Sequence, residues 1–294
     1  MSVSVVVPVY NGGDLLARTV PAVLALGGVG EWVWVDDGST DGSAATINRL
    51  VAAEPRARLV RQGRNTGRGA ARNRGVRETT GDVLVFLDAD VVPPPDAARH
   101  LAAAADGAAS VGRVRPALTD AGDPYQVYLA HARRGPSPER AGRSVPWRFL
   151  ITCVCAVRRP ALVAAGGFDE SVAYGEDFAL ACALAARHPD GLRLADLEVD
   201  LFGVGGLAEA LANARSFGAA LPALEAQCPG ALDLAGVGGA AHSRLLRALA
   251  RRPAPLVLRR ALRRLPESVQ VRAVRYLLGH ALLAGFHGAR DSTP

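Results

Sequence analysis

Two aspartates, Asp88 and Asp90, are separated by one alanine and directly follow five apolar residues, 83–87. An apolar run of this kind is typical of a strand buried on both faces. Residues two apart in a strand point to the same side, so we expect both carboxylates to face one way. Carboxylate oxygens are preferred ligands of Mg²⁺ and Mn²⁺, which often take substrate phosphates as further ligands. The pair therefore predicts a metal site, the alternative being a polar turn in which Asp90 caps the helix after residues 93–95.

A second acidic pair, Glu176 and Asp177, stands where a helical pattern begins after Gly175. The first turn of a helix favours negative charge, so plain capping acids are one interpretation. The other is a general base, a carboxylate that takes a proton from an acceptor hydroxyl. The local pattern alone leaves both open.

Strands and helices must position these acids, and they alternate through the first 90 residues. Apolar runs predict strands at 4–9, 31–35, 57–60 and 83–87, with helical patterns at 14–26, from about 40 to 54, and up to residue 77. Further on, strand patterns at 108–112, 149–157 and 192–201 alternate with helical patterns around 125–129, 161–165, 177–187 and 207–217. This order predicts a mostly parallel α/β sheet with helices on both faces.

Ligands of such sheets bind beyond the carboxyl ends of the strands. Three polar clusters follow predicted strands there, namely residues 10–11, 36–37 and 88–90, and the segment 65–72 joins them as a loop that enters a helix. The glycine spacing of a dinucleotide-binding loop is missing after the first strand, and residues 67–69 do not continue as a phosphate-binding Lys-Ser/Thr loop. A metal at Asp90 would therefore have to hold a diphosphate.

Charge is unevenly distributed along the 294 residues, whose net charge is +6. The chain has no Lys, and residues 242–289 contain ten Arg and one acid, so the basic character belongs to the C-terminal tail. Arg and Leu interleave there, with prolines that divide the tail into short helices. Such helices can lie in an anionic membrane surface or can pack on the body with a solvated basic face. Nucleic acid is disfavoured, because aromatic residues are scarce in the tail.

The four cysteines show neither a secreted disulfide framework nor a zinc-site spacing. No apolar stretch reaches the roughly 18 residues that a membrane span needs, and the N-terminus starts with a strand pattern in place of a leader. We therefore expect a cytoplasmic protein, with the inner face of the cell membrane left open as its location.

Six short motifs occur in a fixed order: PVYN at 8–11, VDDGSTD at 35–41, NTG at 65–67 with ARN at 71–73, FLDAD at 86–90, GGFDE at 166–170 and ED at 176–177. Together they resemble the family 2 glycosyltransferases over residues 3–220. The resemblance implies a GT-A nucleotide-sugar fold and inverting transfer of a sugar from a nucleoside diphosphate sugar. It also implies a glycosyltransferase domain at 1–220, with a nucleotide-sugar half at 1–115 and an acceptor half at 116–220. An Arg-rich helical extension would follow at 221–294.

The resemblance also implies roles for individual residues. The nucleotide-sugar would contact Pro8, Tyr10, Asn11, Asp37, Asn65, Gly67, Arg72 and Asp88, with Asp37 on the base, usually uracil. Asp90, with Asp88 directly or through a water, would bind Mn²⁺ or Mg²⁺. Asp177 would be the catalytic base, with Glu176 as its neighbour. The loop 166–170 would lie beside the donor sugar.

Two features depart from the pattern of many relatives. A His that often follows the ED pair by some twenty residues is absent, and Asp200 stands near the comparable strand end. The tryptophan motif of processive relatives is also missing, which favours non-processive transfer of one sugar to an unknown hydroxyl acceptor.

Two other functions stay open on the sequence. A nucleotidyltransferase could use a similar sheet, although the first loop lacks the basic residue common in such enzymes. A catalytically weak or silent nucleotide-sugar-binding protein would explain the missing His, although the four acids argue against it.

Overall fold

The structure is a computed structural model that describes residues 1–131, 135–235 and 262–291. It divides into two compact units, of which unit 1 comprises Met1–Arg115 and Gly135–Gly203, and unit 2 comprises Pro116–Arg134 and Val204–Pro294. The functional division that we expect at residue 220 stays a prediction, and that residue lies inside helix α8 (Leu207–Gln227).

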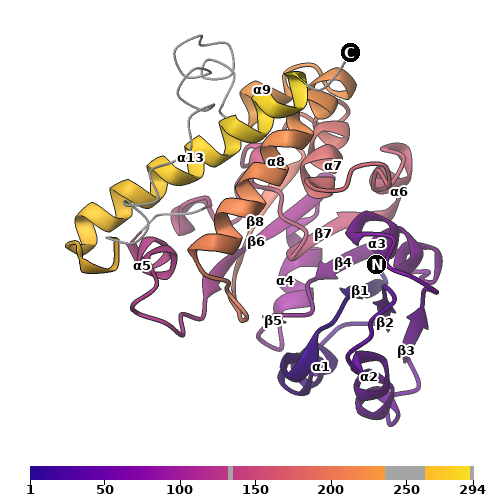
Figure 1. Ribbon diagram of the computed structural model, residues 1–294. Coiled ribbons are helices and arrows are strands. Elements are labelled where there is room, and N and C mark those ends of the chain that lie inside the picture. Colours follow the sequence, from indigo (N-terminus) through magenta and orange to yellow (C-terminus); the bar gives the residue numbers. More distant parts are fainter. Residues whose placement is uncertain (132–134, 236–261, 292–294) are drawn as a thin grey trace. The chain divides into compact units, whose positions relative to one another are not determined.

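An eight-stranded sheet forms the centre of unit 1, in the order β3-β2-β1-β4-β7-β6-β8-β5 (Figure 1). Its strands are β1 (Val3–Val9), β2 (Glu31–Asp36), β3 (Ala57–Arg61), β4 (Val83–Leu87), β5 (Val91–Val92), β6 (Ala109–Pro116), β7 (Val154–Arg158) and β8 (Leu192–Leu201). The pairs β1–β2, β2–β3 and β1–β4 are parallel. The pairs β4–β7, β6–β7 and β5–β8 are antiparallel. The predicted α/β sheet with helices on both faces is confirmed, but it is a mixed sheet and not a mostly parallel one, because β4–β7, β6–β7 and β5–β8 are antiparallel.

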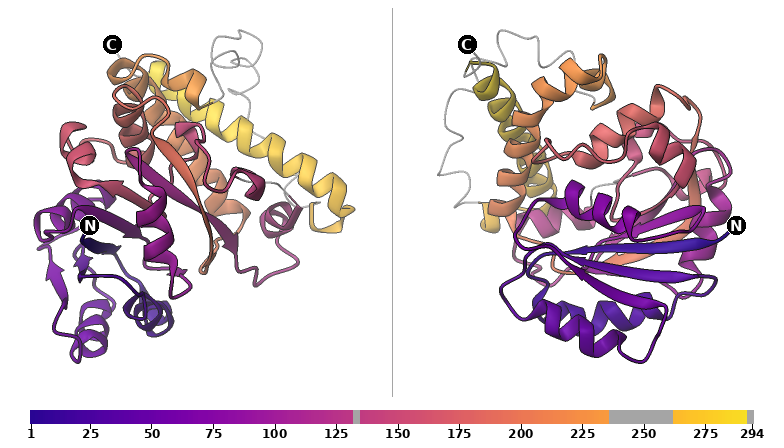
Figure 2. Two further views of the ribbon diagram at one scale, coloured as in Figure 1. Left: turned by 180° about the vertical axis from the view of Figure 1, so that it is seen from behind. Right: turned by 90° about the vertical axis from the view of Figure 1, so that its right-hand side faces the viewer.

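The helices of unit 1 are α1 (Leu16–Leu24), α2 (Ser43–Val51), α3 (Arg68–Arg77), α4 (Ala97–Ala104), α6 (Arg159–Ala164) and α7 (Glu176–Ala185), with short 3-10 helices η1 (Gly13–Leu15), η2 (Pro138–Arg140) and η3 (Trp147–Phe149). Alternation along β2 shows how the faces are assigned. Trp32 and Trp34 belong to the core that α1, α2 and α4 cover, whereas Val33 and Val35 pack with Ala71 of α3. Both views in Figure 2 show α1 and α2 together on one side of the strands.

Several predicted elements need correction. The strand expected at 149–157 begins only at Val154, because η3 occupies the first of those residues. The helix expected from about residue 40 begins only at Ser43, with Gly42 in a left-handed conformation as its N-cap. The capping role considered for Asp90 is also wrong, because Asp96 is the N-cap of α4. The two-residue strand β5 was not expected.

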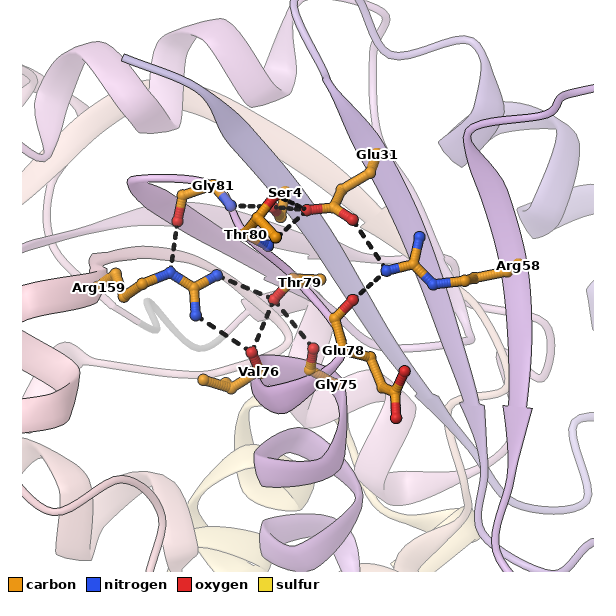
Figure 3. A network of polar contacts seen from close by, with 10 residues as sticks. All are labelled: Ser4, Glu31, Arg58, Gly75, Val76, Glu78, Thr79, Thr80, Gly81 and Arg159. Carbon is orange, nitrogen blue, oxygen red and sulfur yellow. Dashed lines mark hydrogen bonds and ion pairs between the residues drawn. The ribbon is translucent and has the colours of Figure 1, made fainter.

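A network of polar contacts ties the amino ends of β1 and β2 to the turn between α3 and β4 (Figure 3). Glu31 accepts hydrogen bonds from Ser4, from Thr80 and from Arg58. Burial alone would raise the pKa of Glu31, but these hydrogen bonds outweigh it and lower the pKa to about 2. Arg159 donates to Gly81 O and Thr79 Oγ1 of the same turn and to Val76 O in the last turn of α3. The network fixes the sheet at the end opposite to the strand ends that carry the acids.

Unit 2 is helical and contains α5 (Pro124–His131), α8 (Leu207–Gln227), α9 (Ala231–Leu234), η4 (Leu262–Arg264) and α13 (Glu267–Asp291). Helices α8 and α13 lie side by side, and leucines of α8 share a buried cluster with Val274, Leu277 and Ala281 of α13 (Figure 1). Helix α8 runs ten residues beyond the predicted end at 217. The arginine pairs 251–252 and 259–260 of the tail lie outside the described residues. No helix in the described ranges is long and apolar enough to cross a membrane.

Candidate active site

The acids identified in the sequence come together in unit 1. We call Asp88, Asp90, Glu176 and Asp177 the carboxylate cluster. The first two follow the carboxyl end of β4, and the other two form the first turn of α7. Segments almost ninety residues apart in the sequence thus supply one group of negative charges. Such a group needs compensating positive charge, and α3 supplies it.

Arg72 of α3 lies within the carboxylate cluster, with its side chain 1% exposed. Its Nη2 donates to Asp88 Oδ1 at 2.7 Å and its Nη1 donates to Glu176 Oε1 at 2.7 Å. Burial disfavours the charged guanidinium, but the two carboxylates outweigh burial and raise the pKa of Arg72. The guanidinium carbon also lies 5.7 Å from the centre of the Phe168 ring. Arg72 therefore joins the end of β4 to the start of α7.

Asp90 differs from Asp88 and Glu176 because no positive side chain among the described residues forms an ion pair with it. Its Oδ1 is buried and has no hydrogen-bond partner among the described residues. Burial and the nearby Asp88 carboxylate raise the pKa of Asp90 to about 7, although Arg68 acts in the opposite direction. A buried carboxylate oxygen without a donor is the environment that a hard divalent cation would satisfy. Asp90 thus fits the expected metal site.

A metal at Asp90 would not be enclosed by protein ligands alone. Across the described residues, no three His, Cys, Asp or Glu side chains are grouped so that they could hold a metal ion. This fits a cation that one or two carboxylates hold together with substrate phosphates and water. Asp200 is engaged elsewhere, since Arg115 Nε donates to its Oδ1 at 2.7 Å. The end of β8 nevertheless lies beside Asp90, because the N–H of Phe202 donates to Asp90 O at 2.8 Å, so a role of Asp200 in place of the missing His stays a prediction.

Asp177 is the acid of α7 that Arg72 does not bind directly. It is partly exposed, and its Oδ1 accepts a hydrogen bond from the N–H of Phe178. Burial and the adjacent Glu176 carboxylate raise the pKa of Asp177 to about 6, whereas Arg72 lowers it. A carboxylate whose pKa approaches neutrality is a better proton acceptor than an ordinary aspartate. The geometry thus separates a paired acid, Glu176, from an acid that is available for chemistry.

Asn73, the next residue of α3, holds the loop that precedes α7. Its Nδ2 donates to Phe168 O and to Glu170 Oε1, both at 2.8 Å, and its Oδ1 accepts from Phe168 N at 2.9 Å. The Phe168 ring packs edge-on against Phe86 of β4 at 5.2 Å. Consecutive residues of α3 therefore attach both the acidic turn of α7 and the loop 166–170 to the sheet.

A second group, which we call the loop cluster, consists of Asp37, Asn65 and Gly67. Asp37 is buried, and its Oδ1 accepts from Gln62 Nε2 and from both the N–H and the hydroxyl of Thr66. Its Oδ2 accepts from the N–H of Gly67, which also donates to Asn65 Oδ1. Gly67 has a φ of +97°, which residues with a Cβ rarely adopt. Asp37 thus fixes the loop that leads into α3.

The first loop is joined to the second in a similar way. The N–H of Asn11 donates to Ser39 Oγ, and the N–H of Thr40 donates to Asn11 Oδ1, both at 2.9 Å. Asn11 has a positive φ of 50°, and Tyr10 beside it is half exposed. Pro8 is paired with Val35 within the sheet. The rim at the ends of β1 and β2 is therefore ordered, with Tyr10 open to solvent.

Two contributors were not expected from the sequence. Asn73 belonged to a recognised motif, but its contacts with the loop 166–170 depend on a fold contact between residues ninety-five positions apart. Arg68 begins α3, lies 5.9 Å from the Tyr174 ring and favours the charged form of Asp90. An arginine directly after the loop glycine is the only signal in the sequence that could have identified it. The roles assigned to the other site residues stay predictions.

The family of this chain follows from its match to a family model. Residues 4–164 match the model of the family described as "Glycosyl transferase family 2". An undecaprenyl-phosphate 4-deoxy-4-formamido-L-arabinose transferase of Edwardsiella ictaluri is 42% identical over 120 residues, which are 38% of this chain and 37% of the relative. A Pseudomonas aeruginosa protein of the same name is 40% identical over 124 residues, 40% of this chain and 37% of its own. The match thus spans little more than a third of these relatives.

Solved structures support the fold. A mannosyltransferase of Pyrobaculum calidifontis, solved with GDP-Man and Mn²⁺, has a TM-score of 0.58 at 23% identity and covers 96% of this chain and 86% of its own. The Staphylococcus aureus protein TarS, residues 1–349 with UDP-GlcNAc, has a TM-score of 0.59 at 14% identity and covers 99% of this chain and 91% of its own. At these sequence identities the two structural similarities show the fold alone. The family model matches more than half of the residues of this chain, and the chain therefore belongs to glycosyl transferase family 2.

Proposed function

We propose that this protein transfers one sugar, with inversion, from a nucleoside diphosphate sugar to the hydroxyl of an acceptor, with the help of a divalent cation. UDP is the nucleotide that the family resemblance favours. The observation that carries the proposal is the carboxylate cluster at the end of β4, in which Asp90 has a buried oxygen without a donor while Asp177 has a raised pKa. A carboxylate with an unsatisfied oxygen suits cation binding, and a carboxylate with a raised pKa suits proton transfer in the same reaction.

Asp90, with Asp88 beside it, would hold the cation. When bound, Mn²⁺ or Mg²⁺ would supply positive charge to the departing diphosphate. The loop cluster and Asn11 would contact the nucleotide, because they form the ordered loops that follow β1, β2 and β3. Arg68, at the first turn of α3, adds a cation on the same side as Asp90.

Asp177 would accept the proton of the attacking hydroxyl. General base catalysis typically contributes about 10²–10⁴-fold to a rate. We therefore expect Asp177→Asn to lower kcat by at least about 100-fold while changing the dissociation constant of the donor by less than about threefold. Steady-state kinetics and donor titration measure the two quantities. The matched control is Asp190→Asn, an exposed aspartate, which should leave both unchanged. An Asp177→Asn enzyme with full transfer rate would refute the base assignment.

The donor can be identified by thermal shift. A ligand that binds the native state raises the melting temperature as its concentration exceeds its dissociation constant. UDP-, GDP- and dTDP-sugars would be compared with and without Mn²⁺. We expect one nucleotide to stabilise the wild type only when Mn²⁺ is present, and Asp90→Ala to lose that stabilisation. Slow metal-dependent hydrolysis of the same donor would separate an enzyme from a silent binding protein.

A lipid phosphate is a second candidate acceptor, favoured by the names of the undecaprenyl-phosphate transferases. A phosphate oxygen is already ionised at neutral pH and needs no base. If a polyprenyl phosphate is the acceptor, Asp177→Asn should retain most of the transfer rate, in contrast to the result with a hydroxyl acceptor. Assays of both acceptor classes with the same variant decide between them.

Peripheral contact with the cytoplasmic face of a membrane is part of the proposal. Residues 242–289 hold ten Arg and one acid, and α13 exposes Arg272, Arg275 and Tyr276. Each basic residue near an anionic surface contributes about 1 kcal/mol of attraction. We expect sedimentation with phosphatidylglycerol vesicles but not with phosphatidylcholine vesicles. The double variant Arg272→Glu, Arg275→Glu should bind several-fold more weakly, and an unchanged affinity would exclude α13 as the contact.

A further inference from the structure

Arg72 was expected to flank the nucleotide, but its surroundings indicate a different task. Within the described ranges its polar contacts go to protein carboxylates, Asp88 at 2.7 Å and Glu176 at 2.7 Å. Its Nε is buried without a hydrogen-bond partner among the described residues, and the side chain is 1% exposed. A guanidinium enclosed in this way has no exposed edge to offer a phosphate.

The shape of the guanidinium matters as well as its charge. Its nitrogens lie in a rigid plane, so that one group can reach two carboxylates that come from different elements. Here the two carboxylates are 88 residues apart in the sequence, one after β4 and one in the first turn of α7. A lysine would place a single point charge there and could not hold both acids at fixed positions.

We propose that Arg72 is a positioning residue that fixes the first turn of α7 against the end of β4 and commits Glu176 to an ion pair, leaving Asp177 as the acid that acts on the acceptor. The inference rests on the proposed function, because it presumes that Asp177 is the base. It assigns Arg72 and Glu176 to one structural unit instead of to the nucleotide and to catalysis.

The groups that face Asp177 make the proposal testable by pH. Glu176 on its own helix and Asp88 after β4 disfavour its ionised form, whereas Arg72 on α3 favours it. The thiols of Cys153, directly before β7, and of Cys155 on β7 also lie near, and burial raises the pKa of both, so they are neutral. Loss of the Glu176 charge and loss of the Arg72 charge should therefore move the pH midpoint of kcat in opposite directions.

The first test is a double-mutant cycle of unfolding with Arg72→Met, Glu176→Gln and the double variant. Arg72→Met strands a buried carboxylate, so its melting temperature should fall the most. The double variant should melt above Arg72→Met, because the stranded charge is then removed. Arg74→Met is the matched control on the same helix, since its pair with Glu78 is exposed and it should change the melting temperature little. Strict additivity of the two single variants would overturn the proposal.

The second test is kinetic and uses the conservative variants, which keep it decisive even if Arg72→Met does not fold. Glu176→Gln should retain transfer and lower the pH midpoint of kcat by at least about half a unit. Arg72→Lys should lower kcat at least about tenfold while the KM of the donor changes less than about threefold. The opposite pattern, in which Arg72→Lys raises the KM of the donor tenfold with kcat preserved, would show a nucleotide ligand and overturn the proposal.

The assignment of Asp177 as the base and the assignment of Arg72 as a positioning residue can fail separately. If Asp177→Asn retained its transfer rate with a hydroxyl acceptor, the proposed base would be wrong. The unfolding cycle needs no activity and would still decide whether Arg72 and Glu176 act as one unit. A coupled cycle together with an unmoved pH midpoint in Glu176→Gln would overturn the part of the proposal that concerns Asp177.

Discussion

At the first turn of α7, burial and the neighbouring Glu176 raise the pKa of Asp177 to about 6. A base must be ionised to accept a proton. The raised pKa of Asp177 therefore means that activity is lost on acidification already just below neutral pH. We expect kcat with a hydroxyl acceptor to fall tenfold per pH unit below about 6. The pH dependence of kcat, measured at saturating donor and acceptor, checks this.

The same raised pKa has a consequence for stability with a defined sign. Because the folded state holds the proton more tightly than the ordinary value of 3.8, ionised Asp177 destabilises the fold above pH 6. Asp177→Asn should therefore melt at a higher temperature than the wild type at pH 8, and this difference should shrink as the pH falls from 6 towards 4. A lower melting temperature for the variant at pH 8 would contradict the assignment.

Residue types at the site were predictable from sequence, whereas their partners were not. The acids of the carboxylate cluster stood out because two pairs of carboxylates follow apolar runs or begin a helix. That Arg72 is buried between Asp88 and Glu176 depends on the packing of α3 and α7, which no local pattern encodes. The same holds for Asp37, whose acceptors are used by the loop that follows β3.

Among the elements, the turn between α3 and β4 depends on Glu31 at the start of β2. The pKa of Glu31 is lowered to about 2, from 4.5, by donors that include Thr80 and Arg58. A lowered pKa means that the ionised form stabilises the fold above pH 4.5 and that this contribution is lost as the pH falls from 4.5 towards 2. After allowance for solvent screening we estimate it at about 2 kcal/mol.

Glu31→Gln should consequently unfold about 1–2 kcal/mol more easily than the wild type at pH 7, with the difference disappearing near pH 2. Urea unfolding at a series of pH values measures this. Glu54→Gln is the control, because the pair of Glu54 with Arg56 is exposed and should not contribute measurably. A Glu31→Gln difference that persisted undiminished at pH 2 would show that the charge is not the cause.

Strands β1, β2 and β4 were predictable because they are apolar runs that are almost fully buried, and β3 because a short apolar run stands between two helical patterns. The four parallel strands β1 to β4 lie within a residue or two of their predicted ranges. The later strands follow no such rule. Strand β7 pairs antiparallel with β4, and the two residues of β5 pair with the end of β8, so that tertiary contacts define them more than their own sequence does.

At the scale of the whole molecule, unit 2 depends on a close approach of α8 and α13. A Cβ on Gly285 would lie 2.0 Å from Arg215 O, and one on Gly218 would lie 1.9 Å from Leu282 O. Glycine is needed at both positions because the two backbones are in contact. Gly285→Ala should therefore force the helices apart and destabilise unit 2 by about 1–3 kcal/mol, as overpacking usually does.

Gly279→Ala is the matched control on the same helix, since a Cβ there meets nothing within 4 Å. Alanine in an open helical position should stabilise α13 by about 0.5–1 kcal/mol. Circular dichroism during urea unfolding compares the two variants. If both shifted the transition equally, the packing of α8 on α13 would not be the determinant of stability.

The loop that leads into α3 has a consequence for how a donor would be received. Asp37 already satisfies the backbone N–H groups of Thr66 and Gly67 and the amide of Gln62. An incoming nucleotide therefore meets a rim whose conformation is set beforehand, and little chain entropy is lost on association. Calorimetry of donor binding should then record a heat capacity change no larger than the apolar surface buried in the contact accounts for. The association rate of the donor should not be slowed by folding of the loop.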